Sequence, residues 1–269
     1  MGFTPVGRKN LYYIGFAPAN RRKALHVGRK FSSLIMNVEL IPVLEIGYNN
    51  QGLPSPSEHP YWEYPDIWEK YNADCYEKAG FKDKMTSYFP GSSFYRLSEF
   101  SNNNLLKLIN DHTEDFRLGD YNSQKPCPLF GGYVLRIDGE NKYFPQCCGD
   151  LSDIKYWQIL ETGKKSPYHG HPEPLVTFKK DTITFDFTVY DFDEPFAPAP
   201  ANDKLSFPFS LLKEALDHAK YELDLFSIRI KKLNQSEAWN IPDIDKLLIW
   251  GEDWYKQTYA QHGLYASRA

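Results

Sequence analysis

Residues 131–157, GGYVLRIDGENKYFPQCCGDLSDIKYW, decide the fold of this chain. The β-branched and aromatic run Tyr133–Ile137 predicts a strand, and Asp138–Gly139 is a dipeptide typical of tight turns. Lys142–Phe144 then predicts a returning strand. Pro145 lacks a backbone N–H and ends the pairing. The stretch therefore predicts a β-hairpin that leads into a cysteine-containing corner.

Two aspartates after the adjacent cysteines mark the expected start of a helix. Asp150 can accept hydrogen bonds from the amides of the first turn, and Asp153 complements the helix dipole. The same pair could also be interpreted as a general acid and base. We favour capping, because the spacing is that of a helix N-terminus.

Flanking segments predict further strands and helices. Val38–Ile46 is an apolar run in which Pro42 predicts an edge or a bulge. The other predicted elements are a helix over 66–79, a helix over 105–116 capped within 101–104, a hairpin of 175–178 with 182–190, a long helix from 209 to 233, and a second helix from about Pro242. The predicted fold class is α+β, with antiparallel strands around a central hairpin unit, flanking helices and a C-terminal helical pair.

The proline-rich segment 191–204 is the clearest linker in the sequence. It suggests an α+β domain over 1–190 and a C-terminal helical segment over 205–269 that packs on it, or one single domain. The seam of the long helix recurs at alternating spacings of three and four residues, so it requires an apolar partner. We expect that partner within the chain.

Composition and charge exclude some classes of function. The chain has 269 residues, is 16% aromatic and carries a net charge of −4, so nothing in the balance favours nucleic acid. The first 40 residues hold seven basic side chains and one acidic one, whereas residues 41–120 hold 13 acidic and seven basic ones. No apolar run reaches the length of a membrane span. Four scattered cysteines favour a cytoplasmic protein with reduced thiols.

The common nucleotide-binding, hydrolase, zinc-protease and kinase motifs are missing from the sequence. One metal set is conceivable, because His169, His171 and Glu173 would project to one side of an extended segment. Pro172 and Pro174 argue against a regular strand there. We therefore expect no cofactor and no tightly held transition metal, and keep a metal-dependent enzyme using these three residues as the alternative.

The adjacent cysteines are the other candidate for chemistry. In extended backbone, Cys147 and Cys148 would point to opposite faces and could not readily share one zinc ion. One of them could join Cys127 and a histidine, and a thiolate ahead of a helix could act as a nucleophile. Free cysteines are often buried, so we expect small buried hydrophobic side chains.

The segment Tyr143–Asp153, YFPQCCGDLSD, together with Trp157, resembles segments of uncharacterised bacterial toxin-immunity proteins of the SMI1/KNR4-like (SUKH) neighbourhood. That resemblance covers under 30 residues and implies a non-catalytic α+β protein that binds and blocks a toxin. It transfers no site residue. The acidic block 41–120 suggests where a basic protein partner would bind, and we place that contact at Asp111, Glu114 and Asp115. The preferred hypothesis is a non-catalytic cytoplasmic protein-binding protein, and the resemblance implies an immunity protein that neutralises a cognate bacterial toxin.

Overall fold

The computed structural model describes residues 36–119, 126–166, 170–188 and 194–251. Expectations for the basic N-terminal segment and for residues 189–193 lie outside these ranges. The fold is α+β, as predicted. In chain order, the elements are β1 (Val38–Glu45), α1 (Pro65–Ala79), β2 (Phe94–Arg96), α2 (Asn102–His112), α3 (Glu114–Leu118), β3 (Gly131–Ile137), β4 (Glu140–Tyr143), η1 (Leu151–Asp153), α4 (Ile154–Glu161), β5 (Leu175–Lys179), β6 (Thr182–Asp186), β7 (Lys204–Pro208), α5 (Leu211–Ser236) and the helical turn η2 (Lys246–Trp250).

The first sheet is fully antiparallel in the order β2-β1-β3-β4. The predicted hairpin is confirmed: β3 and β4 pair across a turn in which Asp138 and Gly139 both have positive φ angles. The prediction that Pro42 marks an edge strand or a bulge is wrong, because β1 lies between β2 and β3 and its register with β3 continues without a shift through Pro42. Pro42 is tolerated there because β2 pairs only with Val43–Glu45, which leaves β3 as the one neighbouring strand at the proline.

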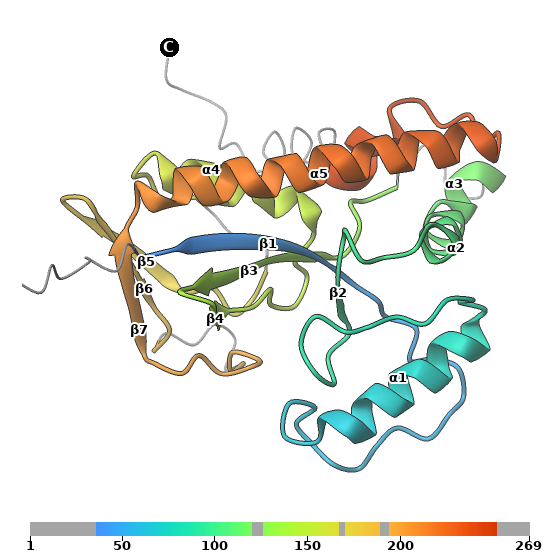
Figure 1. Cartoon of the computed structure of the whole chain (residues 1–269), viewed down its shortest axis with the longest axis horizontal. Helices are drawn as coiled ribbons and strands as arrows, with labels where there is room; N and C mark the ends of the chain where they lie inside the picture. Colours follow the sequence, from blue (N-terminus) through green and yellow to red (C-terminus); the bar gives the residue numbers. More distant parts are fainter. Residues whose placement is uncertain (1–35, 120–125, 167–169, 189–193, 252–269) are drawn as a thin grey trace, which may run out of the picture. The chain divides into compact units, whose positions relative to one another are not determined.

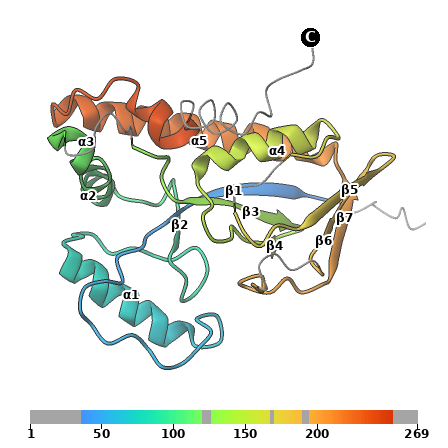
Figure 2. The same ribbon diagram turned by 180° about the vertical axis from the view of Figure 1, so that it is seen from behind.

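Both faces of β1 are buried, which explains its nearly continuous apolar sequence. Val38, Leu40 and Leu44 belong to the main core, into which the long helix α5 also packs. Ile41 and Val43 point to the opposite face and join a smaller apolar cluster. Helix α5 runs along β1 in both views of the chain (Figures 1 and 2).

A second sheet, ordered β5-β6-β7, extends the main core. The predicted hairpin is present as β5 and β6, with Ile183 and Phe185 of β6 and the following Phe187 buried. The Phe185 ring lies 5.8 Å from Trp157 of α4, and the Phe187 ring stacks at 5.5 Å on Tyr143 of β4. These aromatic contacts join the second sheet to the elements on either side of the cysteine corner.

Strand β7 was not predicted, because Lys204 was placed in the linker 191–204 and the next predicted element began at residue 209. The Ser206 hydroxyl of β7 bonds to that of Thr184 on β6 at 2.8 Å. Because the strand is only five residues long and contains a proline, it lacks the length of a clear strand signal. Helix α5 follows at Leu211, without a side-chain hydrogen bond from Ser210 at its N-cap.

The remaining helices follow the local signals of the sequence. Helix α1 has Pro65 in its first turn and ends at Gly80 in the left-handed conformation. Ser101 caps α2, as predicted, but the helix ends at Thr113 and α3 begins after it, so the single helix expected over 105–116 is divided. Among the described residues, no helix is both long and apolar enough to cross a membrane.

Gly131 marks the closest approach within the first sheet. Its φ angle is +140°, and a Cβ atom there would lie 2.0 Å from the carbonyl oxygen of Val43. No side chain can be accommodated at that separation without moving a strand backbone. On its other side, the Gly131 N–H donates to the carbonyl of Gly149 at 3.0 Å. Gly131 therefore connects β1, β3 and the cysteine corner.

We predict that Gly131→Ala lowers the free energy of unfolding by at least about 2 kcal/mol, because the new methyl group displaces β1 or β3 and the residue is strained at positive φ. Denaturant unfolding measures the loss. Gly47→Ala is the matched control, since no atom lies within 4 Å of its added Cβ. Equal, small losses in both variants would contradict a steric role for Gly131.

Candidate functional site

The corner after β4 brings two adjacent cysteines to the same side of the chain. Cys148 has a φ angle of +66°, a left-handed backbone conformation that residues other than glycine rarely adopt. The prediction that Cys147 and Cys148 point to opposite faces is therefore wrong, because it assumed extended backbone. Their Sγ atoms are 3.4 Å apart. A backbone outlier of this kind, next to reactive side chains, is typical of functional sites.

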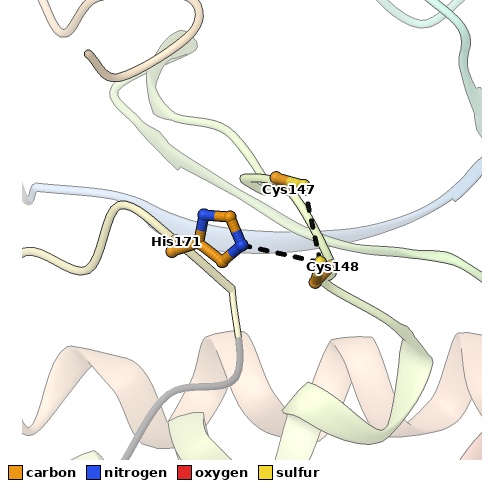
Figure 3. Close-up of side chains that lie close together, drawn as sticks. All are labelled: Cys147, Cys148 and His171. Atoms are coloured by element: carbon orange, nitrogen blue, oxygen red, sulfur yellow. Dashed lines mark hydrogen bonds between the residues drawn. The ribbon is translucent and has the colours of Figure 1, made fainter. Parts of the chain in front are cut away.

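His171 completes a cluster of three potential metal ligands with these cysteines. Its Nε2 lies 3.7 Å from the Cys148 Sγ, and Figure 3 shows the imidazole directed at the thiols. The backbone N–H of His171 donates to the carbonyl of Cys147 at 3.1 Å, so the two segments are joined by a β-bridge. Within the described part of the chain, this is the one group of three His, Cys, Asp or Glu ligand atoms that all lie within 4.8 Å of one another.

Glu194 orients the imidazole from its far side. The Glu194 Oε2 lies 2.9 Å from the His171 Nδ1, on the ring nitrogen that faces away from the sulfurs. A carboxylate at this position fixes the ring and favours the tautomer with the proton on Nδ1. The Nε2 lone pair is then directed towards the cysteines.

Buried backbone and amide contacts hold the corner in place. The Gln146 side chain donates from its Nε2 to the Phe144 carbonyl at 2.8 Å, and its Oε1 accepts the Ala197 N–H at 3.0 Å. The second bond ties the corner to the segment that carries Glu194. At Gly149, an added Cβ would lie 2.8 Å from the Gly131 carbonyl oxygen, so only glycine fits between the corner and β3. These contacts hold the backbone of the corner against β3 and against the segment that carries Glu194.

The cysteines of the site are exposed, which corrects the expectation of buried hydrophobic thiols. Of the four cysteines in the chain, only Cys75 is buried. The Cys147 pKa is raised, first by its hydrogen bond with Cys148 and then by partial burial and nearby carboxylates that include Glu194. A cation bound between the thiols would reverse this effect and favour the thiolate.

A second cysteine–histidine contact lies elsewhere in the structure. The Cys127 Sγ is also 3.7 Å from a histidine nitrogen, the Nε2 of His112. Burial lowers the pKa of His112, and its ring also bonds to the backbone carbonyl of Cys127. This pair has no third ligand among the described residues, so it offers an internal comparison for the three-ligand cluster.

The histidine segment considered in the sequence analysis contributes one ligand to the cluster. His169 lies outside the described residues, and Glu173 is partly buried and not a member of the cluster. His171 is present, but with the cysteines as its neighbours. Sequence reasoning missed this arrangement because nothing local indicates that Cys148 has positive φ or that residue 171 pairs with residue 147.

The acidic residues proposed for partner binding differ in exposure. Glu114 and Asp115 are exposed in the first turn of α3. The Asp111 carboxylate is partly buried, where it accepts a hydrogen bond from the Tyr48 hydroxyl at 2.8 Å and pairs with Lys107. Asp111 therefore has contacts within the chain, and Glu114 and Asp115 are the two of the three carboxylates that are exposed.

Comparison with known proteins adds no family: no family model, curated protein or solved structure matches the chain.

The capping interpretation of the aspartates is confirmed. The Asp150 Oδ1 accepts from the Ser152 N–H at 2.7 Å, and the Asp153 Oδ2 accepts from the Asp150 N–H at 3.2 Å, which is a capping box.

We predict that Asp150→Ala lowers the free energy of unfolding by about 1 kcal/mol, as measured by denaturant titration, while Asp150→Asn retains most of the wild-type stability. An unchanged stability with loss of metal binding would instead give Asp150 a role in the site.

Proposed function

We propose that Cys147, Cys148 and His171 form a binding site for a thiophilic metal ion, with Zn²⁺ as the leading candidate. The observation that carries the proposal is the convergence of two sulfurs and one imidazole nitrogen within 4.8 Å. Thiolate and imidazole are the ligands that zinc and other borderline-soft cations prefer. The expectation of no tightly held metal rested on a different ligand set, the spacing of residues 169, 171 and 173.

The separations between ligand atoms support a tetrahedral ion. With Zn–S bonds of about 2.3 Å and a Zn–N bond of about 2.0 Å, a tetrahedral site places its sulfurs about 3.8 Å apart and sulfur and nitrogen about 3.5 Å apart. The Cys147–Cys148 and Cys148–His171 separations are 3.4 and 3.7 Å. These two separations lie within about 0.4 Å of the tetrahedral values, and the third, between Cys147 and His171, is at most 4.8 Å.

The surroundings of the cluster support the same assignment. Glu194 on the far nitrogen of His171 reproduces the carboxylate–histidine–metal arrangement that strengthens the imidazole as a ligand. Both cysteines are exposed, so a fourth position would be open to water or to a donor from another molecule. Three protein ligands with one open position are typical of catalytic and transfer sites rather than closed structural ones.

A cysteine nucleophile is the competing interpretation of the same residues. Cys148, His171 and Glu194 follow the order of nucleophile, base and orienting carboxylate. That chemistry has no need of a second thiol 3.4 Å from the first. The vicinal pair therefore favours metal binding.

We predict that the untagged protein, dialysed against EDTA and reduced, binds one equivalent of Co²⁺ with a sulfur-to-metal charge-transfer band that Zn²⁺ abolishes. Cys148→Gly should weaken the affinity by roughly 100-fold or more, and Glu194→Gln by about 10–100-fold. Affinity should fall as the pH is lowered, because protons compete for the thiolates and for His171.

Two controls separate loss of a ligand from loss of the fold. Cys148→Gly removes a strained side chain, so its stability should equal or exceed that of the wild type. Cys127→Ser, in the two-ligand pair with His112, should leave Co²⁺ binding unchanged. A protein without the charge-transfer band, in which His171→Gln slows alkylation of Cys148 by iodoacetamide, would favour the nucleophile.

A protein partner is the second candidate function, supported by the display of Glu114 and Asp115 on α3 beside Leu118, whose side chain is 66% exposed. An exposed apolar side chain next to carboxylates suits a basic partner with an apolar anchor. Together with the resemblance of the corner to toxin-immunity proteins, this supports binding of a cognate toxin that acts on nucleic acid.

We predict that co-expressing this protein relieves growth inhibition by a toxin encoded in a neighbouring reading frame. The double variant Glu114→Lys, Asp115→Lys should slow association of this protein with that toxin about threefold or more at low salt. Dissociation should change less. Stopped-flow measurements at low and physiological salt separate the two rates. The control reverses Asp181 and Asp203, which are exposed near the second sheet. Association that responds to neither the reversal nor salt would contradict the proposed contact.

A further inference from the structure

Helix α5 displays an apolar stripe on the side opposite the core. Its buried side chains include Leu216, Leu223 and Ile230. Tyr221, Leu225 and Ile228 are 63%, 47% and 48% exposed. Their spacing of four and three residues places them in one row along the helix, about half a turn from the buried row. Three large exposed apolar side chains in a row on a well-ordered helix form a patch rather than scattered surface residues.

The charges along the same row have opposite signs at its two ends. Asp217 precedes the apolar residues by one turn and Lys232 follows them by one turn, and both are exposed. The asymmetry extends to the whole helix: residues 211–224 carry four acidic and two basic side chains, whereas residues 225–236 carry three basic and no acidic ones. Two copies of such a helix attract each other when they are antiparallel and repel when they are parallel.

We propose that the Tyr221–Leu225–Ile228 stripe binds the same stripe of a second copy of this chain, with the two α5 helices antiparallel. A two-fold axis between Asp224 and Leu225 places Tyr221 opposite the second copy's Ile228 and Asp217 opposite its Lys232, twice over. The contacts are self-complementary, as a two-fold interface requires. From Glu214 to Gln235 the row spans about 32 Å of helix, enough for a helix-to-helix interface.

The surface beside the stripe also suits a second copy. A largely apolar cavity of about 250 Å³ lies between α5 and the loop after β2, with Leu97, Leu225, Phe226 and Arg229 in its lining. It adjoins the centre of the stripe, where an aromatic side chain of the second copy, such as Tyr221, can enter. The proposal concerns a face of α5 and is independent of the cysteine cluster.

The decisive experiment uses charge exchange in the full-length protein, followed by sedimentation equilibrium. Wild type is expected to form dimers. Asp217→Lys and Lys232→Asp each make both end contacts repulsive and should raise the dimer dissociation constant by about tenfold. The double variant should return to within about threefold of the wild type. An equimolar mixture of the two single variants should form heterodimers in preference to either homodimer.

Two further variants test the apolar centre and the specificity of the charge effect. Leu225→Glu should abolish the dimer while leaving the free energy of unfolding of the monomer unchanged, compared at protein concentrations where the wild type has also dissociated, because the side chain is exposed. Asp74→Lys is the matched control: it breaks a lysine–aspartate pair at i, i+4 on α1, as Asp217→Lys breaks the Lys213–Asp217 pair on α5, and should leave the dimer intact. A wild-type protein that stays monomeric at all concentrations would overturn the proposal. So would a lower free energy of unfolding for the Leu225→Glu monomer, because the stripe would then be covered within the chain. Failure of the double variant to restore the dimer would overturn the antiparallel arrangement.

Discussion

The contact of Gly131 with β1 on one side and the cysteine corner on the other is the constraint on which the rest of the structure depends. Its absent side chain lets β3 approach Val43 and Leu44, so the apolar residues of β1 are paired and both of its faces are covered. Its N–H donates a hydrogen bond to the carbonyl of Gly149 and so holds the corner against β3. The same backbone position thus sets the register of the central strands and the place where Cys147 and Cys148 leave the sheet. The central sheet and the candidate site therefore both require that residue 131 has no side chain.

Local signals were enough to predict the elements whose sequence carries a strong period or a strong turn. The β3–β4 hairpin, α1 and the β5–β6 hairpin follow directly from such patterns. Short elements that depend on contacts between distant segments could not be predicted. Strand β7, for example, has five residues and forms by pairing with the edge of β6. The position of β1 inside the sheet, despite Pro42, likewise depends on how short β2 is. In each case the deciding interaction lies between segments distant in sequence.

The candidate site shows the same division more sharply. The sequence analysis considered the cysteine pair and His171 as candidate ligands, but it placed them in two separate sites. The left-handed conformation of Cys148 and the β-bridge between Cys147 and His171 bring them together. Neither feature can be predicted from the neighbouring sequence. Glu194 was invisible for a related reason, since it lies 23 residues beyond the histidine it orients. The assumption of extended backbone at the cysteines was the specific error, because a single φ angle decides whether two adjacent thiols diverge or converge.

The positive φ angle of Cys148 also has an evolutionary meaning. Glycine adopts a left-handed conformation with the least strain, so replacing Cys148 by glycine would stabilise the fold. A cysteine is therefore kept at this position only where selection for its sulfur outweighs that gain in stability. A lineage that no longer needs the sulfur is expected to drift to Cys-Gly-Gly at residues 147–149 without harm to the fold. The residue at this one position therefore separates descendants that keep the chemistry of the corner from those that inherit only its architecture.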